Sequence, residues 1–361
     1  MKIGIDTHSC FGQKTGLGVY TENLVRSIIR ESRDRHIIRC YAKPREKDWN
    51  TAERMQWENY ELLSIAFKDR IRLLHVPCFA PPIIRPFKVV VTVHDLIGMK
   101  FPNQMGWPSR FYWGKWLPVA VRSANAIITD SENSKRDIMQ ELRIPEKKIH
   151  LVYPSGHEGF SNMKNHPKWE ILKKRLNIAE KYFLSVGTLE PRKNLERVIR
   201  AFDEFLKQKR GDVRFQLVIA GSRSFAQGRA YELLVHGSQA NLDDILFTDY
   251  LSQEELNLLY SNSQALIFPS LYEGFGIPVL EAMASGTPVL TSKTSSLPEV
   301  AGSAAWLVDP TQTQQIVEGM ITFGHDESVR SDFVEKGFQQ IKNFSWDKAA
   351  RETIKVYEST V

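Results

Sequence analysis

Short apolar runs separated by longer amphipathic segments recur along this 361-residue chain. The runs are rich in Val, Ile, Leu and Phe, and most do not alternate strictly with polar residues. Such runs are typical of strands that are buried on both faces of a parallel sheet. The predicted strands are Lys2–Asp6, Ile37–Ala42, Leu73–Val76, Val89–His94, Ala126–Thr129 and Ile149–Val152, followed by Tyr182–Val186, Gln216–Ala220, Ile245–Phe247, Ala265–Phe268 and Pro288–Thr291.

Helical patterns such as Leu195–Gln208, Gln253–Ser261 and Pro278–Ala284 lie between these strands. Two successive series of strands and helices predict an α/β protein with two doubly wound domains, which also suits the length of the chain. We expect a first domain over 1–168 and a second over 169–343, joined through the polar stretch from Ser155. Residues 344–361 are expected to form a helix, with Ser345 as its N-cap, that crosses back to the first domain.

The composition is that of a globular protein, with 42% hydrophobic and 25% charged residues. No run of about 18 apolar residues occurs, so no transmembrane helix is predicted. The first six residues are predicted to form a strand and not a signal peptide. Cys10, Cys40 and Cys78 are scattered without CxxC spacing, which argues for a reducing cytoplasm and against a disulfide framework or a zinc site.

Charge is unevenly distributed along the chain. Residues 1–168 carry 27 basic and 17 acidic residues, a net charge of +10, whereas the remainder is net negative at −4. A basic first half favours an anionic partner, such as a membrane surface, a phospholipid-linked acceptor or nucleic acid; ordinary surface solubility explains it equally well. The segment Trp107–Trp116 interleaves aromatic and basic residues at helical spacing, which suits either a membrane interface or a helix packed on its own sheet.

The segment from Glu273 to Glu281 is the strongest candidate for a ligand site. It follows the predicted strand that ends at Phe268, and Pro278 stands where a helix can begin. The glycines at 274 and 276 allow backbone N–H groups to approach a ligand, and a helix N-terminus favours phosphate. The two carboxylates could each accept hydroxyl hydrogen bonds from a sugar or a ribose. Alternatively, Glu281 interacts only with the helix dipole, and Glu273 only caps the loop.

A second loop, Gly187–Asn194, places Arg192 and Lys193 between a predicted strand and a predicted helix. Two cations beside a helix N-terminus suit a diphosphate, although a solvated pair of cations is the simpler interpretation.

Two features of the first half are weaker signals. Gly16 and Gly18 follow the first strand, but Thr21 stands where a dinucleotide-binding fingerprint needs its third glycine. His94 and Asp95 lie at the carboxyl end of a predicted strand, where sheets of this type bind ligands, although a structural histidine is common at such a position.

The run from Glu273 to Glu281 resembles the E-x7-E signature of the family 4 retaining glycosyltransferases, which have the GT-B fold. Together the similar segments cover nearly the whole chain. The other similar segments, in the same order as in the family, are Gly12–Asn23, Val91–Asp95, Ile127–Asp137, Val186–Leu195, Ile219–Gly221, Asp249–Tyr260 and Thr291–Gly302.

The resemblance implies a role for each matching residue of the second half. Glu273 would contact the donor sugar and Glu281 the ribose hydroxyls. Lys193 matches the family lysine, whereas Thr188 stands where many members have an arginine, so we expect Arg192 to supply the second cation. The backbone N–H groups of Phe275, Gly276 and Ile277 would hold the sugar and phosphates, and Gly187 belongs to the same donor site.

In the first half, the resemblance places Gly16 and Gly18 near the donor phosphate and the acceptor entrance. His94 would contact the donor sugar near the reacting carbon, with Asp95 orienting its ring.

The resemblance also implies a fold and a reaction. Two Rossmann-like domains would face a central cleft, and a glycosyl group would pass from a nucleoside diphosphate sugar to a hydroxyl with retention of anomeric configuration. No Asp-x-Asp occurs in the sequence, so no metal and no other cofactor is expected. GDP-mannose is the first choice of donor, with UDP and dTDP sugars as alternatives. The expected acceptor is a lipid-linked or lipopolysaccharide oligosaccharide at the inner face of the cytoplasmic membrane, and nucleic acid is not an expected partner.

Other classes of protein share parts of this pattern. An oxidoreductase with two Rossmann domains would need a better fingerprint and an acid at the end of the second strand, where the sequence has Tyr41-Ala42-Lys43. A GT-B epimerase and a non-catalytic scaffold of a polysaccharide assembly complex remain alternatives. A phosphorylase would need a lysine that binds pyridoxal phosphate, for which no motif is present.

Overall fold

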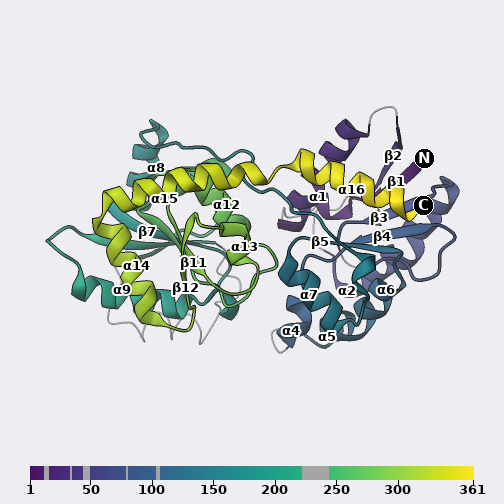
Figure 1. The fold of residues 1–361 in the computed structure, drawn as a ribbon, viewed down its shortest axis with the longest axis horizontal. Helices are drawn as coiled ribbons and strands as arrows, with labels where there is room; N and C mark the ends of the chain where they lie inside the picture. Colours follow the sequence, from purple (N-terminus) through teal and green to yellow (C-terminus); the bar gives the residue numbers. More distant parts are fainter. Residues whose placement is uncertain (12–15, 33–34, 44–48, 79, 103–105, 222–243) are drawn as a thin grey trace. The chain divides into compact units, whose positions relative to one another are not determined.

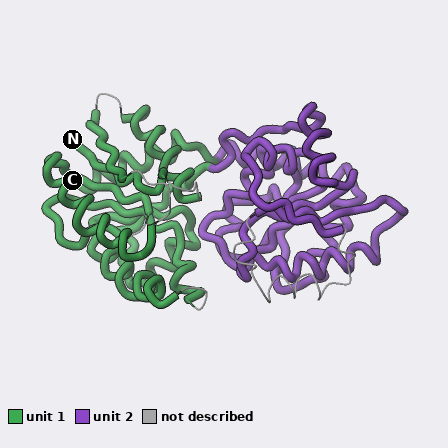
Figure 2. Tube along the Cα trace, turned by 180° about the vertical axis from the view of Figure 1, so that it is seen from behind, with its two compact units in different colours: residues 1–155, 344–361 green, residues 156–343 purple. Residues whose placement is uncertain are grey.

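The computed structural model describes residues 1–11, 16–32, 35–43, 49–78, 80–102, 106–221 and 244–361. The chain forms two compact units, shown in different colours in Figure 2. Unit 1 consists of Met1–Ser155 together with Phe344–Val361, and unit 2 consists of Gly156–Asn343.

The boundary expected after residue 168 is replaced by one at residue 155. The polar segment that follows belongs to unit 2 because its backbone bonds to a helix there. The N–H of Met163 donates to Ser261 Oγ at 2.9 Å, and the N–H of Ser161 donates to Asn257 Oδ1 at 3.4 Å. Polar composition alone does not reveal such contacts, because they depend on a helix about 100 residues further along the chain.

Unit 1 contains a six-stranded sheet in which every pair of neighbouring strands is parallel. The order β2-β1-β3-β4-β5-β6 places the second strand on one side of β1 and all later strands on the other. The point at which the order reverses therefore lies between β1 and β3. The strands are β1 (Lys2–Asp6), β2 (Ile37–Tyr41), β3 (Leu73–Val76), β4 (Lys88–Thr92), β5 (Ala126–Thr129) and β6 (Ile149–Leu151).

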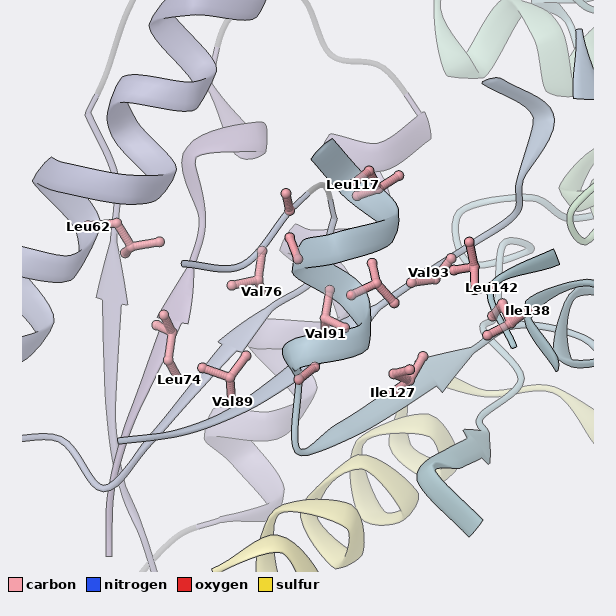
Figure 3. Close-up of a cluster of buried hydrophobic side chains, with 14 of the residues drawn as sticks. Leu62, Leu74, Val76, Val89, Val91, Val93, Leu117, Ile127, Ile138 and Leu142 are labelled. Carbon is pink, nitrogen blue, oxygen red and sulfur yellow. The ribbon is translucent and has the colours of Figure 1, made fainter. Parts of the chain in front are cut away.

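Helices cover both faces of this sheet (Figure 1). One face packs Val89 and Val91 of β4 against Leu62 and Leu117 from the helices above it (Figure 3). The helices of unit 1 are α1 (Gly16–Glu31), α2 (Thr51–Gln56), α3 (Leu62–Lys68), α4 (Ile97–Lys100), α5 (Trp107–Phe111), α6 (Leu117–Ser123), α7 (Glu132–Glu141) and α16 (Trp346–Thr360), with π-helical turns at Trp57–Glu61 and Tyr112–Trp116.

The C-terminal helix α16 belongs to unit 1, although unit 2 precedes it in the sequence. Its N-cap is Ser345, whose side chain accepts a hydrogen bond from the N–H of Lys348. Ile354 and Tyr357 of this helix share a buried cluster with α1 and the opposite face of the sheet. The Tyr357 hydroxyl also lies 2.6 Å from Nδ1 of His75, which is completely buried in β3.

Unit 2 contains a second six-stranded parallel sheet with the order β12-β11-β10-β7-β8-β9. Here β7 and β10 are the neighbours at which the order reverses. The strands are β7 (Lys181–Val186), β8 (Phe215–Ala220), β9 (Ile245–Phe247), β10 (Ala265–Phe268), β11 (Val289–Ser292) and β12 (Ala305–Val308). The helices are α8 (Lys168–Leu176), α9 (Leu195–Gln208), α11 (Gln253–Asn262), α12 (Ile277–Ala284), α13 (Leu297–Ala301), α14 (Thr313–His325) and α15 (Glu327–Gln340).

All eleven predicted strands occur, but β12 was not predicted. It contains four residues, and only Ala305 and Val308 at its ends are buried. Trp306 and Leu307 are partly exposed because this strand forms the edge of the sheet, although all four of its residues are apolar.

The structure confirms one of the two interpretations of the aromatic segment Trp107–Trp116, and its contact with a membrane stays a prediction. Tyr112 is buried, and its hydroxyl donates to Glu58 at 2.7 Å, so the segment packs on its own unit. Trp107 and Phe111 instead form an exposed stacked pair with ring centroids 6.2 Å apart. No helix within the described ranges is long and apolar enough to span a bilayer.

Candidate active site

The candidate site of unit 2 is formed by the loops that follow β7 and β10. These two strands are neighbours in the sheet, and both are parallel, so their carboxyl ends lie at the same edge. Sheets of this type bind ligands at such a reversal of strand order. The β7 loop carries Arg192 and Lys193, and the β10 loop carries Glu273.

These three residues form one ion-pair cluster. Arg192 Nη1 lies 2.8 Å from Oε2 of Glu273, and Lys193 Nζ lies 2.7 Å from Oε1 of the same carboxylate. The side chains are only 12%, 14% and 9% exposed for Arg192, Lys193 and Glu273. The sequence-predicted cations and the first acid of the motif are therefore in direct contact.

Glu190 extends this cluster and was missed by the sequence analysis. Its Oε2 lies 2.6 Å from Arg192 Nε, so Arg192 bridges two acids. The hydroxyl of Thr188 donates to the other oxygen of Glu190. Thr188 thus supports the acid that holds Arg192, which explains how a threonine fits at this position. An acid two residues before Arg192 was the available signal, but the sequence alone does not show which cation it pairs with.

The cluster is electrostatically balanced, because Arg192 and Lys193 face Glu190 and Glu273. Burial by itself would raise the pKa of Glu273, but the ion pairs with Lys193 and Arg192 hold that pKa below its usual value. Burial would likewise lower the pKa of Arg192, and the two acids raise it instead. The carboxylate of Glu273 and the guanidinium of Arg192 are consequently charged at neutral pH.

Glycines shape the backbone of both loops. Gly276 has a φ of +112°, and a Cβ there would lie 2.7 Å from Leu297 Cδ2, so a side chain does not fit just before α12. Gly187 has a φ of +140°, and Lys193 packs against its Cα. The hydroxyl of Ser296 donates to the carbonyls of Glu273 and Phe275 at 3.0 and 2.8 Å, which fixes the path of the loop.

Glu281 lies one turn into α12, after Ile277, and its Oε2 accepts a hydrogen bond from the hydroxyl of Tyr260 at 2.9 Å. Burial raises the pKa of Glu281 to about 7, although the bond from Tyr260 opposes this shift. The two acids of the motif therefore differ: Glu273 is ionised through its ion pairs, whereas Glu281 is half-protonated near neutral pH.

In unit 1, His94 pairs with Asp130 and not with Asp95. Its Nδ1 lies 2.5 Å from Asp130 Oδ2, and the edge of Tyr20 packs on the ring with centroids 4.5 Å apart. Asp95 accepts a bond from the N–H of Ile97 at 2.9 Å, and its charge also raises the pKa of His94, so a part for Asp95 in orienting the ring stays a prediction. Burial would lower the pKa of His94, but Asp130 raises it above its usual value.

Comparison with known proteins identifies the family. Residues 168–340 match the family described as Glycosyl transferases group 1, and residues 16–155 match Glycosyltransferase Family 4. The O-antigen chain mannosyltransferase B of Escherichia coli is 30% identical over 292 residues, which are 81% of this chain and 75% of that protein. This chain is a family 4 glycosyltransferase.

Two further similarities agree with this membership. The serotype-specific mannosyltransferase WbdA of Escherichia coli is 28% identical over 269 residues, covering 73% of the glycosyltransferase described here but only 32% of WbdA. The structure of HepE from Anabaena, solved in complex with UDP-glucose, superposes with a TM-score of 0.73 at 16% identity, covering 99% of this chain and 100% of HepE. The GT-B fold predicted from the sequence is thereby confirmed, and the glycosyltransferase is related to O-antigen mannosyltransferases.

The predicted site residues of the glycosyltransferase fall into two groups. Arg192, Lys193 and Glu273 meet directly, and Gly187, Phe275, Gly276, Ile277 and Glu281 belong to the same loops or to α12. His94, Gly16 and Gly18 lie in unit 1.

The two predicted glycines of unit 1 have different surroundings. Gly16 is the first residue of α1, and a Cβ there would meet no atom of the described chain within 4 Å. At Gly18, a Cβ would lie 2.4 Å from the carbonyl oxygen of Ser9. The absence of a side chain at this position therefore allows α1 to pack closely against the preceding turn. Contact of either glycine with a donor stays a prediction, and residues 12–15 of the predicted segment lie outside the described ranges.

A second histidine–carboxylate pair, Asp6–His8, was not predicted. His8 Nδ1 lies 2.9 Å from both oxygens of Asp6, at the end of β1, and its ring stacks on Trp49 with centroids 4.8 Å apart. The available signal was a histidine two residues after an acid that ends a strand. Within the described parts of the chain, no group of three or more His, Cys, Asp or Glu side chains could hold a metal ion.

Proposed function

We propose that this glycosyltransferase transfers mannose from GDP-mannose to a hydroxyl of a lipid-linked or lipopolysaccharide oligosaccharide, with retention of configuration and without a metal ion. Its relation to O-antigen mannosyltransferases supports the choice of sugar. The observation that carries the donor class is the pair of buried cations, Arg192 and Lys193, held against Glu273 at the reversal of strand order.

Each charged residue of the site has a place in donor binding. Arg192 and Lys193 would neutralise the diphosphate, because cations held in a partly buried site stabilise phosphate charge without rearranging water. Glu281 would accept hydrogen bonds from the ribose hydroxyls, and Glu273 from hydroxyls of the sugar. The N-terminus of α12 and the loop N–H groups would complete the phosphate contacts.

The reaction proposed here occurs on one face of the sugar. The bond from the anomeric carbon to the leaving phosphate oxygen breaks, the acceptor oxygen forms a bond to the same face, and the acceptor proton passes to the leaving phosphate. Glu273 is not assigned as a nucleophile, since its proposed task is to accept hydrogen bonds from the sugar hydroxyls. The protein would accelerate the reaction mainly by stabilising charge on the leaving diphosphate.

Unit 1 is proposed to bind the acceptor and to contact an anionic membrane surface from the cytoplasmic side. Between Gly106 and Ser123 the chain has three basic residues and no acid. The side chains of Trp107 and Phe111 are 77% and 46% exposed. Aromatic and basic residues on one exposed helical segment are suited to the interface of an anionic bilayer.

Thermal unfolding in the presence of EDTA tests donor binding, because a ligand of the folded state raises the Tm with concentration. GDP and GDP-mannose are expected to raise the Tm more than UDP, UDP-glucose or dTDP sugars. If no nucleoside diphosphate raises the Tm, donor binding as proposed is wrong. If UDP stabilises as well as GDP, the assignment of GDP-mannose loses its support.

Sedimentation with phosphatidylglycerol vesicles, compared with phosphatidylcholine vesicles, tests the membrane contact. The wild type is expected to bind only the anionic vesicles, and the double variant Trp107→Ser, Phe111→Ser is expected to lose most of this binding. Equal binding of the wild type and the double variant would contradict the assigned surface. Ile171→Ser in α8 is a matched control, because Ile171 is also a largely exposed apolar residue but lies in unit 2.

A further inference from the structure

The carboxylate of Glu273 occupies the same cations that a donor diphosphate needs. Lys193 Nζ donates to Oε1 at 2.7 Å, and Arg192 Nη1 donates to Oε2 at 2.8 Å. We propose that Glu273 competes with the diphosphate for Arg192 and Lys193, and that this competition makes the site prefer the intact donor over the nucleoside diphosphate product. The proposal rests on the donor binding described above and goes beyond it, because it assigns Glu273 a role in product release.

A diphosphate that draws both cations toward itself weakens their bonds to Glu273, even though each cation has further N–H groups. The Glu273 side chain is 9% exposed, so little water can replace the bonds that it loses. A buried carboxylate without partners is strongly unfavourable, and its side chain must therefore gain new donors when the cations leave. Whether this exchange of partners is favourable therefore depends on whether the ligand brings other hydrogen-bond donors to Glu273.

The intact donor and the product differ in this respect. The sugar hydroxyls of the donor can donate to Glu273 and so replace Arg192 and Lys193 as its partners. The product lacks the sugar, so its diphosphate removes the cations and offers Glu273 nothing in return. After transfer, Glu273 would form its ion pairs with both cations again, and the affinity of the site for the product would fall.

Glu190 provides an internal contrast, because it is an acid in the same cluster with a different position. It pairs with Arg192 through Nε at 2.6 Å, and its other oxygen accepts from the Thr188 hydroxyl. Glu273 is contacted through other atoms, Arg192 Nη1 and Lys193 Nζ. Glu190 thus holds Arg192 in place, and removing its charge changes the net charge of the cluster by the same amount as removing that of Glu273.

Isothermal titration calorimetry of GDP and GDP-mannose with the wild type, Glu273→Gln and Glu190→Gln tests the proposal. We expect Glu273→Gln to bind GDP about tenfold more tightly than the wild type, a change of about 1.4 kcal/mol, while GDP-mannose binds no more tightly. The ratio of the two Kd values, GDP over GDP-mannose, would fall about tenfold. Glu190→Gln is expected to leave this ratio within about twofold of the wild type, because it changes both affinities in parallel.

Three results would overturn the proposal. The first is that Glu273→Gln weakens GDP and GDP-mannose equally, which would make Glu273 an ordinary binding residue. The second is that Glu190→Gln changes the ratio as much as Glu273→Gln, which would make the effect one of net charge. The third needs no variant: the wild type binds GDP more tightly than GDP-mannose. If the wild type binds neither ligand, the proposed function fails together with this inference; if it binds both and the ratio is unaffected, only the inference fails.

Discussion

The two sheets have related architectures, but the points at which their strand orders reverse carry different chemistry. In unit 2 the reversal between β7 and β10 gathers four charged side chains into one balanced cluster around Arg192. In unit 1 the reversal between β1 and β3 carries the Asp6–His8 pair, and the predicted His94 lies one strand further, after β4. The comparison indicates that one unit is suited to compensating the charge of a diphosphate and the other to directional hydrogen bonding.

The difference also affects how each site is held together. The unit 2 cluster joins two loops through charge, so a charged ligand can exchange with its members. His94 and His8 of unit 1 are each held by a carboxylate and an aromatic ring, Asp130 with Tyr20 for His94 and Asp6 with Trp49 for His8. Such pairs set the direction of a ring nitrogen and are not expected to open when a ligand binds.

The largest effect is expected at Lys193. Lys193→Ala should lower kcat for sugar transfer by about 10²–10³-fold, since it removes one of the two side-chain cations assigned to the leaving diphosphate. Initial rates with radiolabelled donor measure this effect. Lys207→Ala is the matched control, because Lys207 is an exposed lysine of α9 that pairs with Glu204 outside the candidate site. If Lys193→Ala turns over nearly as fast as the wild type, the cluster of unit 2 does not compensate the charge of the leaving diphosphate as proposed.

A smaller effect is expected from the titration of Glu281. Its carboxylate should accept the ribose hydroxyls, so binding should require the ionised form of a group whose pKa is about 7. Nucleotide affinity should therefore increase about tenfold per pH unit below pH 7 and level off above it, with a proton released on binding. Calorimetry from pH 5.5 to 8.5, in buffers of different ionisation enthalpy, measures both quantities.

Glu281→Gln should abolish this pH dependence and should also lower the affinity for the nucleotide. A pH dependence that persists in the variant would assign the titration to another group. Affinity that falls with rising pH in the wild type would contradict the ionised form as the acceptor.

In unit 1, Asp130→Asn should lower transfer about tenfold, a typical size for losing a partner that orients a functional histidine. Because Asp130 raises the pKa of His94, the variant should also titrate His94 at lower pH than the wild type. NMR titration of histidine-labelled protein, with His94→Gln for assignment, measures this shift. Asp95→Asn should lower the His94 pKa less than Asp130→Asn does, because Asp130 also bonds to the ring; an equal shift in both variants would give Asp95 the role expected from the sequence.

The smallest effect is expected on stability, and it should be confined to unit 1. Tyr357→Phe removes the hydroxyl that lies 2.6 Å from His75 in the core of unit 1. We expect this change to lower the free energy of unfolding by about 1–2 kcal/mol, because it leaves a buried ring nitrogen without one partner. Hydrogen exchange should show faster opening of α16 and β3 but unchanged exchange in β7 and β10. Destabilisation of both units alike would contradict the assignment of α16 to unit 1.

Much of the fold could be predicted because parallel strands buried on both faces leave an unambiguous apolar pattern. Leu73–Val76 and Ala126–Thr129 were predicted with the bounds that the structure has, and so was the helix Leu195–Gln208. The edge strand β12 was missed, although its four residues are all apolar. A run this short does not by itself distinguish a strand from part of a buried helix.

The residues of the candidate site that belong to local sequence motifs could be predicted from the sequence. Arg192, Lys193 and Glu273 were found because each lies in a loop between a strand and a helix. Which side chains pair across loops depends on the order of strands in the sheet, which the local pattern does not encode. For this reason the pairing of His94 with Asp130 was not foreseen. The bond between Glu190 and Arg192 lies within one loop, and it was missed because the sequence does not show which of the two adjacent cations the acid pairs with.

The central claim is that the Arg192–Lys193–Glu273 cluster of unit 2 binds the donor diphosphate. A crystal structure of the protein grown with GDP and EDTA tests it most directly. The account predicts phosphate oxygens within hydrogen-bonding distance of Lys193 Nζ and the Arg192 guanidinium, with Lys193 withdrawn from the Glu273 carboxylate. A diphosphate bound elsewhere, with both cations still paired to Glu273, would contradict it.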